Sequence, residues 1–157
     1  MSDAFSTADI ESFVSRFYKG LPLLLTPYGY TSTFLALAQN AQATNVLNIQ
    51  ANADFVLLAV KFRSQIGAAQ TVTNKTAPFV RILLIDSGSN EQFTNAPVDI
   101  TAYSPSLYEG ALPYPRILAG RSTLTIQVTN YAPTAETYTS LDIYLSGLLV
   151  RELSAQP

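Results

Sequence analysis

The chain has 157 residues without cysteine or histidine, and its 9 basic and 11 acidic residues give a formal net charge of -2. A chain of this length can fold as one domain without disulfides or metals. The missing residue types exclude Ser-His and Cys-His catalysis and nearly all zinc, copper and haem ligation. So few basic residues provide no stripe for a phosphate backbone, and we expect no nucleic-acid partner.

Charged residues make up only 13% of the chain, about half the usual fraction for a soluble domain. The surface must therefore consist largely of Ser, Thr, Asn, Gln and Tyr. Such a surface suits wide contact with protein neighbours, because few ions lose their water when it is covered. The opening MSDAFSTADIES is polar and acidic, so we expect no signal peptide there, and the apolar runs LPLLL and SGLLV are too short to span a bilayer. We expect synthesis in a cytoplasm and no membrane partner.

The N-terminal residues predict one amphipathic helix. Ser6 lies three residues before Asp9, which is the spacing of a capping box, and Gly20 and Pro22 end the helical pattern. Two interpretations are open: the helix docks on its own domain, or it is an arm that packs on a neighbouring subunit. The apolar residues that recur at helical spacing are Ile10, Phe13, Val14, Phe17 and Tyr18.

The next segment, Leu21 to Gln42, has two prolines and a glycine between apolar clusters. This pattern is ambiguous, and we interpret it as an extended linker that could include a short strand. The sequence therefore predicts two parts, a helical arm with its linker over residues 1–44 and a β-domain over residues 45–157.

From Asn45 onward the hydrophobic pattern has a period of two residues, which is typical of strands. No helical stretch interrupts it, so parallel βαβ units are excluded. The spacing between strands is about ten residues, which predicts an all-β sandwich of jelly-roll type with about eight antiparallel strands behind the helical arm. The expected strands are NVLNIQ, DFVLLAVKFR, FVRILLID, PVDITA, PRIL, STLTIQVTN and YTSLDIYLSGLLVREL.

The stretch ILLIDSGSN resembles the active-site loop of an aspartic protease, with Asp86 as the candidate carboxylate. That mechanism needs two carboxylates sharing a proton, and the chain has one such loop, so the enzyme would have to be a dimer. ILAGRS is similar to the apolar-Gly-Arg segment of dimeric proteases, but Ala119 breaks its order. The simpler interpretation is a turn in which the aspartate accepts backbone N–H groups and Gly88 supplies a positive φ. We expect a turn and no catalytic residue.

A long polar connection, YSPSLYEGALPY, carries Tyr103, Tyr108 and Tyr114. It could be a rigid surface connection or a protein-contact loop, because tyrosine buries a large area at little entropic cost. Loop tyrosines with Asn and Asp would also suffice for a sugar site, although no pattern marks one. The remaining acids are scattered, so we expect no metal site, no glycosidase pair and no cofactor.

Read together, IDSGSN, TNAPVDI, LPYPRIL, GRSTLTIQVTNYA and LDIYLSGLLV resemble the head cement or decoration proteins of tailed bacteriophages, small virion proteins with jelly-roll folds. The resemblance covers roughly Asn45 to Val150. It implies a non-enzymatic protein on the capsid surface that bridges major capsid protein subunits, and it implies no catalytic residue.

We expect the contacts with the capsid or with a neighbouring subunit to come from aromatic residues of the arm and of the long loop. We also expect self-association as a homodimer or homotrimer. The alternatives are another virion position, such as the neck, tail or spike base, a carbohydrate-binding β-sandwich, and a dimeric aspartic protease that uses Asp86. The expected contact residues are Phe13, Phe17, Tyr18, Tyr103, Tyr108 and Tyr114.

Overall fold

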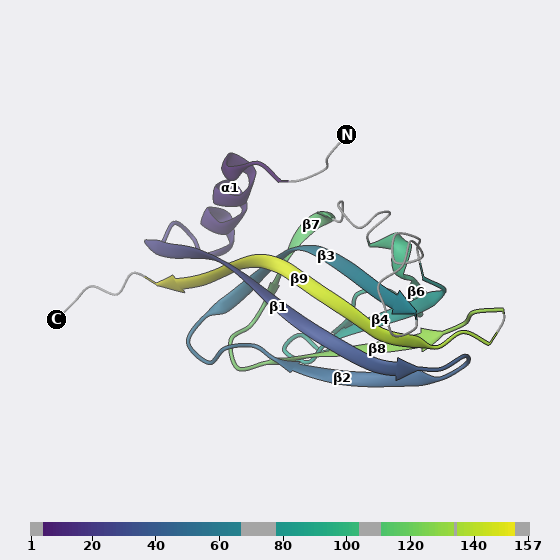
Figure 1. Ribbon diagram of the computed structural model, residues 1–157. Helices are drawn as coiled ribbons and strands as arrows, with labels where there is room; N and C mark the ends of the chain where they lie inside the picture. The colour runs from purple at the N-terminus through teal and green to yellow at the C-terminus, as the bar shows by residue number, and fades with distance from the viewer. Residues whose placement is uncertain (1–4, 67–77, 104–110, 134, 153–157) are drawn as a thin grey trace.

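The computed structural model describes residues 5–66, 78–103, 111–133 and 135–152. In this part of the chain a helix, α1 (Thr7–Phe17), precedes two antiparallel sheets that pack face to face (Figure 1). The strands are β1 (Leu23–Leu37), β2 (Gln42–Asn48), β3 (Asp54–Ile66), β4 (Val80–Asp86), β5 (Glu91–Gln92), β6 (Val98–Asp99), β7 (Ala111–Leu118), β8 (Thr123–Asn130) and β9 (Tyr138–Glu152). Sheet A has the order β1-β9-β3-β7, and sheet B has the order β2-β8-β4-β5, with β6 also paired to β4.

The strand pairing is nested. β1 pairs with β9, β2 with β8, β3 with β7, and β4 with the short strands β5 and β6. This pairing arises when one long antiparallel ribbon folds over so that its two halves face each other. The result is a jelly roll. The predicted all-β sandwich of jelly-roll type is therefore confirmed.

The core lies between the two sheets and follows the alternation seen in the sequence. In β8, Leu124, Ile126 and Val128 are fully buried, while Thr125 and Gln127 between them are only partly buried. The inner face of β9 contributes further side chains that are fully buried: Leu141, Ile143 and Leu145. Strands with one apolar face are what a two-layer sandwich requires.

The prediction of a linker over Leu21 to Gln42 is wrong, because most of this segment is strand β1. It pairs with β9 from Leu23 opposite Glu152 to Leu37 opposite Tyr138. Pro27 is tolerated because β1 is an edge strand and Thr33, an even number of residues away, directs its carbonyl outward to Asn45 Nδ2. The backbone nitrogen of residue 27 therefore also faces away from β9. The sandwich thus begins at β1, and a boundary at residue 44 would cut through β2.

The segment PVDITA also differs from its prediction as a strand. Only Val98–Asp99 pairs, as β6, and a 3-10 helix, η2 (Ile100–Ala102), follows directly. The side chain of Asp99 accepts a hydrogen bond from the N–H of Thr101 at 3.0 Å and caps this helix. The chain turns at this point, and Ile100 is completely buried in the capped turn.

Helix α1 is confirmed and lies against its own sheet (Figure 1). Ser6 and Asp9 form the predicted capping box, and Gly20 ends the segment with a φ of 75°. Val14 is buried against Val56 and Val150 on the outer face of sheet A. The helix therefore docks on its own domain. Among the described residues, no helix is long and apolar enough to cross a membrane.

Gly147 provides a test of the central β3–β9 packing. A Cβ at this position would overlap the backbone carbonyl oxygen of Val56. We expect Gly147→Ala to lower the free energy of unfolding by about 1–3 kcal/mol, as overpacking does in other cores. Urea denaturation at neutral pH measures this. The control is Ser146→Ala on the opposite face of β9, which we expect to change stability by about 0.5 kcal/mol or less. An unchanged midpoint for Gly147→Ala would contradict the close approach.

Candidate protein-contact surface

Three predicted contact residues meet at the outer face of sheet A. Phe13 and Phe17 lie one turn apart on α1, with ring centroids 6.4 Å apart. Tyr114 of β7 packs edge-on against Phe13, with centroids 5.1 Å apart and an interplanar angle of 84°. Phe17 is 56% exposed and Tyr114 67% exposed. We call Phe13, Phe17 and Tyr114 the aromatic patch. Edge-to-face packing stabilises such a cluster beyond the area it buries.

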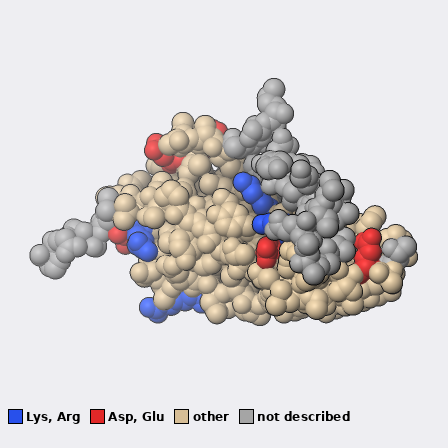
Figure 2. Space-filling view, in the orientation of Figure 1, with Lys and Arg blue, Asp and Glu red and all other residues tan. Residues whose placement is uncertain are grey.

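The local sequence explains why these rings share one surface. Phe13 and Phe17 are four residues apart and therefore share one side of α1. Phe13 packs against the apolar cluster of Val14, whereas Phe17, one turn further, is exposed. Pro113 and Pro115 flank Tyr114 and hold the backbone of β7 extended. Figure 2 shows Lys, Arg, Asp and Glu at separate places on the face that it draws, with wide uncharged areas between them.

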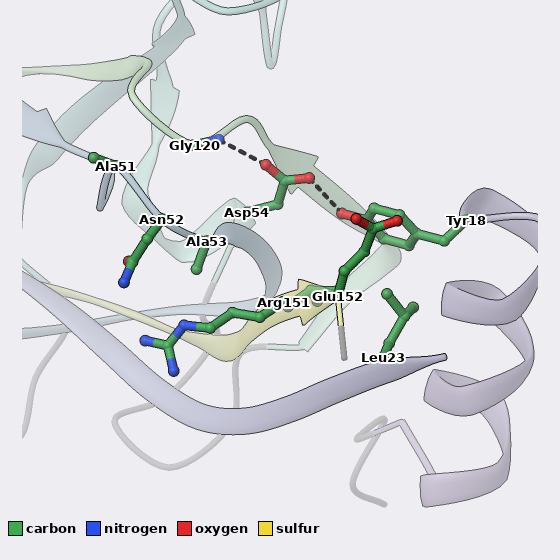
Figure 3. A pocket seen from close by; sticks show the side chains of 10 residues that line it. Tyr18, Leu23, Ala51, Asn52, Ala53, Asp54, Gly120, Arg151 and Glu152 are labelled. Carbon is green, nitrogen blue, oxygen red and sulfur yellow. Dashed lines mark hydrogen bonds between the residues drawn. The ribbon is translucent and has the colours of Figure 1, made fainter. Parts of the chain in front are cut away.

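Tyr18 has a different role, because its hydroxyl points into the domain. It donates a hydrogen bond to Asp54 Oδ2 at 2.7 Å, and Asp54 Oδ1 accepts from the backbone N–H of Gly120 at 2.8 Å (Figure 3). Burial, together with the hydrogen bond to Asp54 and the charge of that carboxylate, raises the pKa of Tyr18 well above its usual value. These bonds tie the end of α1 to the start of β3 and to the β7–β8 turn.

A cavity of about 630 Å³ opens beside this pair and is also lined by Arg151 and Glu152. In Figure 3 the guanidinium group of Arg151 points away from the Asp54 carboxylate. Both oxygens of Asp54 are already bonded within the protein. The hydrogen-bonded pair of Tyr18 and Asp54 therefore fixes the helix to the sheet.

Tyr103 is not one of the rings of the aromatic patch, but it lines a groove that Tyr114 also lines. It is partly buried against the core beside Phe93 and Val98. Burial raises the pKa of the Tyr103 hydroxyl, while Thr94 and the charge of Arg116 oppose the rise. Tyr108 lies outside the described residues. Of the six predicted contact residues, the structure brings Phe13, Phe17 and Tyr114 together in the aromatic patch. The ring of Tyr18 also packs edge-on against Phe17, with centroids 5.0 Å apart, although its hydroxyl is bonded to Asp54.

Asp86 is a turn residue, as expected. It is 2% exposed, and its Oδ1 accepts from the N–H of Gly88 while its Oδ2 accepts from the hydroxyl of Ser89, both at 2.9 Å. The positive φ was assigned to the wrong residue, because Asn90, and not Gly88, has it, at 58°. Both carboxylate oxygens are engaged in holding the turn. In the described part of the chain, no three acidic residues are grouped so that they could hold a metal ion.

Sequence reasoning missed the exposed apolar residues of the first two strands. Leu35 in β1 is 73% exposed and Val46 in β2 is 58% exposed. A signal was available, because no Lys, Arg, Asp or Glu occurs from Leu21 to Ala53. The low charge of the whole chain does not show this feature, because it does not tell where the charged residues are missing.

The hydrogen bond between Tyr18 and Asp54 predicts that the stability of the fold depends on pH. The folded protein holds the Tyr18 proton more tightly than the unfolded chain, whose ordinary tyrosine pKa is 10.0. The stability that the phenol contributes is therefore complete below pH 10 and declines as the pH rises above 10. We expect Tyr18→Phe to lower the free energy of unfolding by about 1–2 kcal/mol at pH 7. Urea titrations of both proteins at pH 7 and at about pH 11 should show this difference narrowing, and a constant difference would contradict the assignment.

No protein-family model matches this chain, and no curated protein sequence matches it. Among solved structures, it is similar to a chain of maize chlorotic mottle virus, with a TM-score of 0.36, 11% identity and coverage of 84% of this chain and 97% of that one. It is also similar to a chain of desmodium yellow mottle tymovirus, with a TM-score of 0.36, 14% identity and coverage of 86% and 91%. A likeness this distant assigns no function to the chain.

Proposed function

We propose that this protein is a non-enzymatic structural component of a virion, where it binds the outer capsid surface and bridges major capsid protein subunits. The observation that carries the proposal is the aromatic patch, which presents Phe17 and Tyr114 to solvent on the outer face of a jelly roll. The jelly roll is an architecture of viral capsid domains. The resemblance to phage head cement proteins, read from the sequence, suggests the same role.

The composition of the patch suits a protein interface. Exposed aromatic side chains release much ordered water when they are covered and lose few rotamers. Asp9 and Arg16 of α1 line a hollow together with Phe13 and Tyr114, so charged groups lie beside the rings, as at the polar rim of an interface. On a shell with many identical sites, several modest contacts of this kind can hold a bridging subunit through avidity.

The docked position of α1 favours contact through the fixed helix and not through a released arm. Releasing the helix would expose Val14 and break the bond from Tyr18 to Asp54. A patch that is held in place before binding also avoids the entropy cost of ordering a segment. We therefore assign the capsid contact to the outward rings of the docked helix together with Tyr114.

A carbohydrate-binding β-sandwich is the second candidate, because jelly rolls also form lectin domains. The feature that favours it is an apolar groove of about 420 Å³ beside the patch, lined by Tyr103, Leu112 and Tyr114 among others. Aromatic walls of this kind can stack against a sugar ring. A glycan array with the whole protein distinguishes the two candidates, since the capsid proposal expects no selective glycan binding.

Co-sedimentation with empty phage heads tests the capsid proposal. The experiment uses the whole chain, because removal of residues 1–44 would delete strand β1. We expect the double variant Phe17→Ser, Tyr114→Ser to bind at least about tenfold more weakly, a loss of about 1.4 kcal/mol. The same assay with heads, necks and tails distinguishes the capsid surface from other virion positions.

The matched control is Leu35→Ser, which removes a side chain that is even more exposed but lies near the other end of β1 from α1 (Figure 1). It should bind as the original protein does. Urea midpoints confirm that all variants are folded. Equal binding by the double variant would remove the patch from the interface, and no sedimentation of the original protein with any phage particle would overturn the virion role.

A further inference from the structure

Strand β2 lies at the edge of sheet B and pairs only with β8 among the described residues. Two hydrogen bonds show which of its backbone groups face β8. The carbonyl of Ala41 accepts from the N–H of Asn130, and the N–H of Ile49 donates to the carbonyl of Ser122, both at 3.0 Å. Backbone direction alternates along an antiparallel strand, so the odd-numbered residues between them also face β8. The N–H and C=O groups of the even-numbered residues point outward: Gln42, Thr44, Val46 and Asn48.

The other sheet edges in the described part of the chain carry features that block pairing. Proline, charge and short length are the usual means by which proteins protect an edge. β1 contains Pro27, and its Thr33 carbonyl already accepts a hydrogen bond from Asn45 Nδ2 at 3.0 Å. β7 contains two prolines and Arg116, while β5 and β6 have two residues each.

The edge of β2 has none of these features. Its seven residues, QATNVLN, include no proline, glycine or charge. The chain carries no charged residue from Leu21 to Ala53, so neither β1 beside it nor the flanking turns supply one. An exposed, uncharged strand with free backbone groups is a template for another strand.

We infer that β2 pairs antiparallel with β2 of a second copy of this chain, with a two-fold axis at Asn45. This register places Thr44 opposite Val46 and Gln42 opposite Asn48. Each of these four residues then donates its N–H and accepts at its C=O across the axis, so every outward backbone group of both strands is bonded. A shift of the axis by one residue in either direction leaves one end of the strand unpaired.

A second copy fits this edge because β2 is complementary to itself. The β-branched side chains of Thr44 and Val46 meet on the solvent face, where such cross-strand pairs are stabilising. The amides of Gln42 and Asn48 meet at the two ends, and no like charges oppose each other. A contact that uses the same surface on both subunits closes as a dimer and does not propagate into a fibre. The inference goes beyond the proposed function and does not depend on it.

Analytical ultracentrifugation of the purified chain across a range of concentrations is the first test. The mass should rise from that of a monomer toward that of a dimer. Val46→Pro removes one outward N–H and leaves the β2–β8 ladder intact, so it should stay monomeric and folded. Val46→Lys places a charge at the same position and should also abolish the dimer, whereas the control Val46→Thr should preserve it.

Amide hydrogen exchange followed by NMR tests the surface and the register together. At a concentration where nine-tenths of the chain is dimeric, exchange at Thr44 and Val46 should slow about tenfold relative to dilute protein. Exchange at Ala43, Asn45 and Leu47 should not depend on concentration, because these amides face β8 in both states. A chain that stays monomeric at all concentrations would overturn the inference. A dimer that survives Val46→Pro and Val46→Lys, or one that protects other amides, would also overturn it.

Discussion

The pairing of β1 with β9 holds the rest of the structure together. The first and last strands run antiparallel from Leu23 opposite Glu152 to Leu37 opposite Tyr138. β9 also pairs with β3, which makes it a central strand of sheet A. Its inner face fills the core, and its outer face supports the helix near Val150. Because the partners lie at opposite ends of the chain, their pairing closes a loop of most of the chain and carries the entropy cost of that closure.

The aromatic patch depends on that ladder. Val14 needs a flat apolar platform, and Val56 of β3 and Val150 of β9 provide it only when the two strands are side by side. The bond from Tyr18 to Asp54 then fixes the end of the helix, and the same carboxylate holds the turn at Gly120. The orientation of the exposed rings is therefore a consequence of sheet formation and not a property of an independent arm.

The two proposed contact surfaces use different physical forces at different places. The aromatic patch lies on the outer face of sheet A and would bind through the burial of side-chain rings. The β2 edge belongs to sheet B and would bind through backbone hydrogen bonds in an uncharged strand. Neither surface covers the other, so a subunit could pair with its own copy and still present its rings to a different partner.

The sequence by itself determined the features that arise from neighbouring residues: the Ser6 cap of α1, the buried alternation of β8 and the turn at Asp86. Each depends on contacts within a few residues, so the local pattern contains the information. Only the tertiary structure decided that β1 is a strand, since its proline and glycine weaken the local signal and its partner is at the other end of the chain. It likewise decided that Tyr18 turns inward while Phe17 faces solvent, because the carboxylate that attracts Tyr18 comes from β3. Long-range pairing and a distant charge cannot be read from one segment alone.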